Sequence, residues 1–412
     1  MKGLPRFVVA LLASQALTHL AGAMVSLATI WYVSGLSHRP NLLVTLYVLL
    51  ELPYLLFLIP SGRWVDGRHR YPFVLLGSAL RVGVMGGFAL WAHNRPLAIA
   101  GVMGFLILGE GVTAVVQPAR SAWTTELVPP GQRGNLAAVN HGALAIAGMV
   151  GPALGGILYA RGRLGGVVGV AAGLMTVAWT IMALTGRGRE PRSDVVPFPS
   201  PPRKQGDGFQ FLRQHPGMLT MVAFFALTNA LNNVEAVLVP LLAHRLLHLA
   251  SWQFGILSLA SGGGALAGSW LAARVFQGRS VRWAFVSMGV FGGMIIGLGL
   301  SHTLAMLGGF YLVLGLSFAV TEVITSTLWQ VLVPDAVRGQ VMGALSTVAR
   351  AANPAGYVLA GALDEWLGIR GGLVAGGLAI ILLSVVVVWN RAIIRLDEAS
   401  HSPKDGSMVQ SS

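Results

Sequence analysis

The stretches LVPPGQRG, at residues 127–134, and LVPDAVRG, at residues 332–339, decide how this chain is organised. They lie 205 positions apart, and a shift of that length lays residues 127–158 on residues 332–363 without a gap. Ten of the 32 paired positions are identical. Apolar composition cannot generate the loop match, because its proline, arginine and glycine recur at fixed spacing. The pattern therefore predicts an internal duplication.

Long apolar segments lie on both sides of each copy. Crossing about 30 Å of hydrocarbon takes about 20 apolar residues of helix. Segments of that kind lie near residues 7–35, 42–61, 72–92, 97–117, 137–160, 165–186, 217–243, 252–273, 283–301, 304–328, 341–363 and 371–394. The sequence thus predicts an all-α membrane protein with 12 transmembrane helices in two pseudo-symmetric six-helix bundles. The expected bundles are residues 1–186 and 217–394, joined by a cytoplasmic linker at 187–216 and followed by a disordered tail at 395–412.

Composition agrees with helices that pack in lipid. Hydrophobic residues make up 54% of the 412 residues and charged residues 10%, against roughly 25% charged residues in soluble domains. The 54 glycines would weaken soluble helices, but between membrane helices they allow close approach. Because cysteine is absent, disulfides, thiolate metal sites and cysteine nucleophiles are excluded. The net charge of +13 does not form a basic stripe with aromatics, so nucleic acid is not an expected partner.

The basic residues predict the orientation. Of the 28 lysines and arginines, two lie within spans (Arg81 and Arg350), and six lie in loops on one side: Arg39, Arg95, Arg161, Arg163, Arg245 and Arg370. The remaining twenty, Arg120 among them, fall on the side of both termini. Positive charge favours the cytoplasmic side. We therefore expect both termini to be cytoplasmic and the protein to be multi-pass in the cell inner (cytoplasmic) membrane.

A loop motif follows the second expected helix and reads GRWVDGRHR at residues 62–70. It resembles the loop signature of the major facilitator superfamily, with Gly67 and His69 departing from the usual pattern. The resemblance implies a conformational latch at Gly62, Asp66, Arg68 and Arg70, in which charge-assisted contacts break as the bundles rock.

A second motif lies in the fifth expected helix and reads GPALGG at residues 151–156. Gly151, Pro152, Gly155 and Gly156 resemble the antiporter motif of proton-coupled drug exporters in that superfamily; an ordinary glycine-packed helix is the alternative. The stretches QPAR at 117–120 and ELVPP at 126–130 are similar to the macrolide-efflux and enterobactin-exporter branch.

Ionisable and amide side chains inside spans are costly and therefore functional candidates, with helix packing as the alternative. In the superfamily fold, the first, fourth, seventh and tenth helices line the cavity. The resemblance makes one residue on each a proton-coupling candidate: His19, Glu110, Glu235 and Glu322. Substrate-cavity candidates are Glu51, Asn229, Asn232, Asn233 and Arg350, and Arg81 is a charge-pair candidate. Four embedded acids against two embedded arginines favour a neutral or cationic substrate.

Together these features predict a secondary active transporter that exports a small amphipathic, drug- or macrolide-like molecule by alternating access, in exchange for protons. An antiporter of this kind would contribute to multidrug resistance. The alternatives are a siderophore or lysolipid transporter without proton coupling and a non-transporting membrane receptor. An enzyme is not expected, because HExxH and GxSxG motifs and cysteine are missing, and primary pumping is not expected because a P-loop is missing. The expected partners are the substrate, protons and the bilayer; no cofactor or metal is expected, and the protein is expected to be a monomer.

Overall fold

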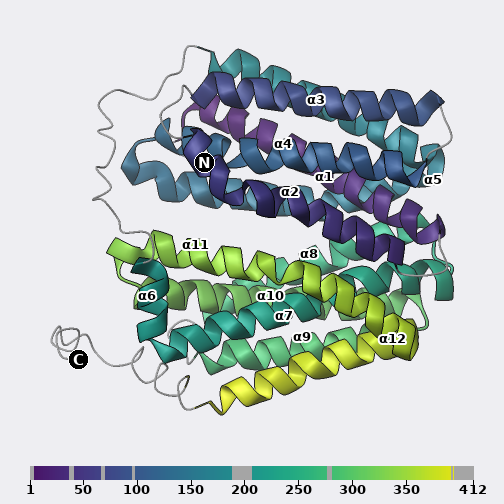
Figure 1. The fold of residues 1–412 in the computed structure, drawn as a ribbon, viewed down its shortest axis with the longest axis vertical. Coiled ribbons are helices and arrows are strands. Elements are labelled where there is room, and N and C mark those ends of the chain that lie inside the picture. Colours follow the sequence, from purple (N-terminus) through teal and green to yellow (C-terminus); the bar gives the residue numbers. More distant parts are fainter. Residues whose placement is uncertain are drawn as a thin grey trace. The chain divides into compact units, whose positions relative to one another are not determined.

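The computed structural model describes residues 4–36, 41–65, 70–94, 98–187, 207–275, 281–390 and 393, and helices form nearly all of this part. They are α1 (Arg6–Leu36), α2 (Asn41–Val65), α3 (Arg70–Asn94), α4 (Ile99–Glu126), η1 (Pro130–Gln132), α5 (Arg133–Gly186), α6 (Asp207–Gln214), α7 (Pro216–Leu241), η2 (Leu242–Leu246), α8 (Ser251–Val275), α9 (Arg282–Leu300), α10 (Leu304–Leu332), α11 (Asp335–Ala351) and α12 (Asn353–Val388) (Figure 1). The expected tail at 395–412 and residues 188–206 of the expected linker lie outside the described residues.

Within the described ranges, nine helical stretches are long and apolar enough to cross a membrane. The all-helical, multi-pass membrane class is therefore confirmed. Two of these stretches, Pro130–Gly186 with 57 residues and Gln340–Val388 with 49, far exceed the roughly 20 residues that one crossing needs. Where the side chains of α2 are described, it contributes a shorter apolar stretch, Asn41–Phe57. The count of twelve crossings remains a prediction.

Both of the long stretches contain a break at equivalent places. The backbone of α5 leaves helical geometry at Arg163 (φ 53°, ψ −166°), and that of α12 leaves it at Gly368 (φ 70°, ψ 170°). These two positions are 205 residues apart, which is the period of the sequence repeat. Each of α5 and α12 is therefore two helices joined by a tight reversal, as the polar residues near 161–163 and 364–370 predicted.

The repeated loop motif also has one conformation in both copies. Pro129 (φ −55°, ψ 149°) and Pro334 (φ −56°, ψ 142°) are both extended, and each follows a fully buried valine, Val128 or Val333. Each proline ends the preceding helix and orients the next, because it lacks an N–H and prefers this φ. The duplication seen in the sequence is thus visible in the backbone.

The described helices form two compact units. Unit 1 comprises Met1–Pro201, Val237–Gly262 and His302–Leu304, and unit 2 comprises Pro202–Ala236, Gly263–Ser301 and Ala305–Ser412. In unit 1, α1 packs along α5, α3 packs against α4 and α5, and α2 packs on α4. In unit 2, α9 packs along α12, and the short α6, inside the expected linker, packs on α11. The expected bundles at 1–186 and 217–394 remain a prediction.

Glycines allow helix backbones to touch inside each unit. A Cβ on Gly155 of α5 would lie 2.6 Å from the carbonyl oxygen of Met24 in α1. In unit 2, a Cβ on Gly292 of α9 would lie 2.8 Å from the carbonyl oxygen of Gly377 in α12. Real Cβ atoms do not approach carbonyl oxygens so closely, so only glycine fits these crossings. The high glycine content therefore serves helix packing.

The two breaks lead to a paired prediction. Arg163 holds a backbone conformation that costs an L-residue about 1–3 kcal/mol, whereas Gly368 adopts its conformation without that cost. We expect Arg163→Gly to raise the melting temperature of the purified protein in detergent and Gly368→Ala to lower it, each by about 1 kcal/mol of unfolding free energy. Equal effects of both substitutions would contradict the assigned turn geometry.

Candidate functional site

Four ionisable side chains from three helices form the charged group of unit 1: His19 on α1, Arg81 on α3, and Glu110 and Arg120 on α4. Arg81 lies close enough to each of the other three for electrostatic interaction, which is favourable only with Glu110. The Nε atom of Arg81 is buried and finds no hydrogen-bond acceptor among the described residues. A buried donor without an acceptor is costly. Arg81 is therefore the least satisfied member of the group.

Glycines make room for two of these side chains. Gly22 lies one turn beyond His19 on the same face of α1, and a Cβ there would lie 3.6 Å from Nη2 of Arg81. A Cβ on Gly148 of α5 would lie 3.5 Å from Nε2 of His19. The structure thus brings His19 and Arg81 to neighbouring positions along α1. Glu110 lies within electrostatic range of Arg81, the charge-pair candidate, and the role of that pair remains a prediction.

Arg120 is a buried arginine near the end of α4, and the sequence analysis placed it on the side of both termini. Its Nη2 donates to Ser14 Oγ at 2.8 Å, and Ser14 Oγ donates to the carbonyl oxygen of Ala178 at 2.7 Å. This chain of hydrogen bonds joins α4, α1 and α5 around Arg120, a residue that is 9% exposed. α4 runs on to Glu126, beyond the expected span end near residue 117, and the side of the membrane on which Arg120 lies remains a prediction. The absence of glycine between Pro118 and Glu126 was the available signal for a longer helix.

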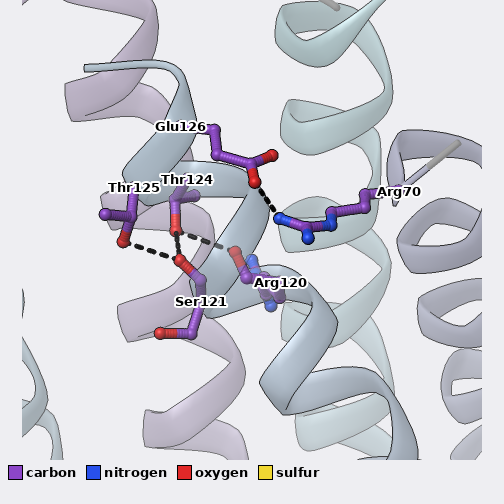
Figure 2. Close-up of polar contacts among 6 residues, drawn as sticks. All are labelled: Arg70, Arg120, Ser121, Thr124, Thr125 and Glu126. Atoms are coloured by element: carbon purple, nitrogen blue, oxygen red, sulfur yellow. Dashed lines mark hydrogen bonds and ion pairs between the residues drawn. The ribbon is translucent and has the colours of Figure 1, made fainter. Parts of the chain in front are cut away.

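Arg70 and Glu126 form an ion pair where α3 begins and α4 ends (Figure 2). Their side chains are 23% and 29% exposed. A cation at a helix N-terminus and an acid at a helix C-terminus each oppose the helix dipole, and pairing offsets both effects. Thr124 and Thr125 donate back to the α4 backbone in the same turn, at 2.8 Å to Arg120 O and Ser121 O respectively.

The latch residues are only partly described. Arg70 pairs within unit 1, and Gly62 lies in α2. Asp66 and Arg68 lie outside the described residues. The latch role of the four residues remains a prediction.

The GPALGG motif lies where α5 packs on two other helices of unit 1. Gly151 and Gly155 face α1, while Gly156 faces the start of α8, where Ser251 Oγ donates to the Gly156 carbonyl at 2.8 Å. A Cβ on Gly255 of α8 would lie 2.7 Å from the Pro152 carbonyl oxygen. The motif therefore serves close packing in this conformation. Its antiporter role remains a prediction.

The acid on α7 has a partner in unit 2. Glu235 accepts a hydrogen bond from the Tyr311 hydroxyl on α10. The sequence analysis did not identify Tyr311, because no local sequence pattern links position 311 to position 235. Tyr311 therefore supplies a hydrogen-bond donor to the Glu235 carboxylate. The proton-coupling role of Glu235 remains a prediction.

The asparagines of α7 hold the junction between α11 and α12. Asn229 Nδ2 donates to the Ala349 carbonyl at 3.2 Å, and Asn233 Nδ2 donates to Asn353 Oδ1 at 3.0 Å. Pro354 follows directly and supplies no N–H, so backbone carbonyls before it need other donors. The Asn353–Pro354 pair was the sequence signal for this junction. A substrate role for Asn229, Asn232 and Asn233 remains a prediction.

The other predicted residues lie on separate helices. Glu322 on α10 and Arg350 on α11 are exposed, and Glu51 on α2 is partly buried. Across the described residues, histidines and acids do not gather in threes that could hold a metal ion. Candidate chemistry therefore rests on single ionisable groups inside helices.

These observations define the class: a multi-pass helical membrane protein with an internal repeat and ionisable groups within its spans. The chain belongs to the Major Facilitator Superfamily, whose family model matches residues 7–356. This is a family of transporters and not of enzymes. Membership means that the protein binds a small-molecule substrate in the membrane.

Two relatives are efflux proteins. Macrolide efflux protein A of Streptococcus pyogenes is 24% identical over 394 residues, covering 93% of this chain and 96% of that protein. The multidrug efflux pump Tap of Mycolicibacterium fortuitum is 26% identical over 370 residues, covering 85% and 87%. The resemblance to the superfamily and its macrolide-efflux members is thereby confirmed at the level of distant homology.

Solved structures support the fold. A bacterial homologue of the human lysosomal transporter Spinster, in an inward-facing and occupied conformation, matches with a TM-score of 0.75 and 14% identity, covering 96% of this chain and 98% of that one. The peptide transporter POT in complex with alafosfalin matches with a TM-score of 0.76 and 14% identity, covering 97% and 96%. At such identities the likeness concerns the fold alone.

The neighbouring asparagines of α7 provide a matched pair for a test. Asn233→Ala removes the donor at 3.0 Å from Asn353 Oδ1 and leaves that oxygen only the longer bond from Asn229 Nδ2 at 3.4 Å, so we expect a loss of about 1 kcal/mol. Asn232→Ala removes a side chain without a described hydrogen bond, so we expect a change within about 0.5 kcal/mol. Thermal unfolding in detergent measures both. If the two variants unfold at the same temperature, Asn233 does not hold the junction.

The ion pair at the ends of α3 and α4 can be tested by charge exchange. Arg70→Glu or Glu126→Arg alone sets two like charges side by side, and we expect each to lower the melting temperature. The double variant Arg70→Glu/Glu126→Arg restores the pair and should recover at least half of the loss. Additive losses in the double variant would show that the pair contributes nothing to stability.

Proposed function

We propose that this chain exports a small amphipathic molecule, of drug or macrolide type, by alternating access and in exchange for protons. The observation that carries the proposal is the presence of carboxylates within spans of a Major Facilitator Superfamily chain whose relatives are efflux proteins. A carboxyl inside a membrane is costly and is retained where it takes part in a transport cycle. Glu110, Glu235 and Glu322 are the candidate proton carriers, with His19 beside Arg81 as a fourth.

The proposed architecture has twelve crossings in two related halves. Nine of the described apolar stretches are long enough to cross a membrane. If α5 and Gln340–Val388 each cross twice and α2 crosses once, the number of crossings is twelve. Equivalent breaks at Arg163 and Gly368 support the same plan in each half. Both termini would then face the cytoplasm of an inner membrane, on the side that carries twenty basic residues.

The α5 motif supports exchange as the mode of coupling. Its glycines let α5 approach α1 and α8, and contacts of this kind exclude water and ions from the helix crossings. A closed crossing prevents protons from leaking past the substrate, which exchange requires. Multidrug resistance would follow from export of such substrates, and the protein would work as a monomer.

The coupling is tested in proteoliposomes with an imposed pH gradient and a pH-sensitive dye inside. Addition of erythromycin to wild-type vesicles should dissipate the gradient. The double variant Glu110→Gln/Glu322→Gln should lose this response, because an amide cannot carry the proton. The two single variants then assign the coupling to one acid.

The control is Glu365→Gln, which changes an exposed acid near the break of α12 and should behave like the wild type. A folded double variant that still dissipates the gradient would refute Glu110 and Glu322 as carriers. Export of a substrate from drug-sensitive cells without any pH response would favour uncoupled transport, as for a siderophore or lysolipid. Binding without passage across a sealed vesicle would identify a receptor.

A further inference from the structure

Exposed tryptophans and arginines gather at one end of unit 2, where α8 and α12 end and α9 begins. Trp270 is 59% exposed, Trp283 is 42% exposed and Trp389 is 77% exposed. Two exposed arginines accompany them on α8 and α9. We call this set the aromatic-basic rim: Trp270, Arg274, Arg282, Trp283 and Trp389. Large exposed rings that gather in one place mark an interaction surface.

Helix packing brings the rim residues to the same end. Ala272 of α8 and Ala284 of α9 are buried in one apolar cluster with Val320 of α10. α9 also lies along α12 (Figure 1), and a Cβ on Gly289 would lie 3.8 Å from Cβ of Ser384. Each rim residue follows or precedes one of these contacts by at most five positions. The ends of the three helices therefore present the rim together.

The length of α12 relates the rim to the bilayer. Trp389 lies 21 residues beyond the break at Gly368. At 1.5 Å per residue this is about 32 Å of helix, close to the roughly 30 Å of hydrocarbon in a bilayer. Trp366, next to the break, is 75% exposed. Exposed tryptophans at both ends of one crossing are typical of the two membrane interfaces. The helix length thus puts the rim at the depth of lipid headgroups.

The charges of the rim favour a negatively charged headgroup. Arg274 Cζ lies 5.0 Å from the ring centroid of Trp270, one helical turn earlier on α8. This cation–π contact orders an exposed arginine at the level of an exposed ring. Residues 263–301 contain three arginines and no acid, and residues 371–388 contain no acid. The helices that form the rim therefore bring positive charge without acids of their own.

We infer that the aromatic-basic rim binds the headgroup of an anionic phospholipid, with Arg274 and Arg282 at its phosphate and the tryptophan rings beside its glycerol. Arginine suits a phosphate because its planar donors form two parallel hydrogen bonds. Tryptophan suits this depth because its ring is apolar and its N–H is a donor. Two guanidinium groups favour a lipid with net negative charge over a zwitterionic one. The inference goes beyond the proposed transport function and depends on neither substrate nor proton.

The test is native mass spectrometry of the full chain in detergent micelles. Phosphatidylglycerol and phosphatidylethanolamine with the same acyl chains are titrated separately, and the affinity of the first bound lipid is compared. The wild type should prefer phosphatidylglycerol by about tenfold or more. The double variant Arg274→Gln/Arg282→Gln should lose about fivefold in affinity for phosphatidylglycerol per arginine and little for phosphatidylethanolamine.

The control is Arg161→Gln/Arg245→Gln, which removes the same charge from unit 1 and should keep the preference. Inorganic phosphate should not displace the lipid, because it has no chains to lie against the tryptophans. Displacement by inorganic phosphate would identify a site for small anions and overturn the inference.

Equal affinities of the wild type for the two lipids would also overturn the inference, as would equal losses in the two double variants. Equal losses would show that net charge alone attracts the lipid. If the rim double variant fails to fold, the single variants Arg274→Gln and Arg282→Gln decide, each with an expected loss of about fivefold. The titration measures no transport, so a failure of the proposed proton exchange leaves its outcome unchanged.

Discussion

Contact between helix backbones at glycines is the interaction on which the rest of the structure depends. Lipid removes the hydrophobic effect as a force between helices, so they associate through close packing and hydrogen bonds. Gly155 against α1, Gly255 against α5, and Gly292 against Gly377 provide that packing within their units. Serine hydroxyls add to it where they reach the carbonyl of a neighbouring helix, as Ser14 and Ser251 do. Side chains at these crossings would separate the helices.

Polar groups inside the spans divide into satisfied and unsatisfied ones, and this division bears on function. Arg120 is held by Ser14, Glu235 by Tyr311, and two asparagines of α7 by the junction of α11 and α12. Such groups stabilise a helix arrangement. Arg81 retains a buried donor without an acceptor in the described part of the chain.

The duplication extends from sequence to backbone. Positions that match in the loop motif share an extended proline and a buried valine, and the reversals at Arg163 and Gly368 recur at the same period. The two copies nevertheless differ in side chains: arginine occupies the strained position in one, and glycine relieves it in the other. The two copies therefore share a backbone plan while the residue at the break differs between them.

The sequence by itself determined the membrane class, the helices and the repeat, because apolar length, glycine content and the recurrent LVP motif act locally or at a fixed period. It also identified the ionisable residues inside the spans as functional candidates, because inserting an ionisable group into a membrane costs free energy whatever the rotation of its helix. The partners of those residues were decided only by the tertiary structure. Whether Arg81 meets Gly22, Asn233 meets Asn353 or Glu235 meets Tyr311 depends on the rotation and crossing of helices distant in the chain, which local patterns do not encode. The burial of Arg120 was not predicted for a related reason: the end of α4 contacts Arg70 and Ser14, which belong to other helices.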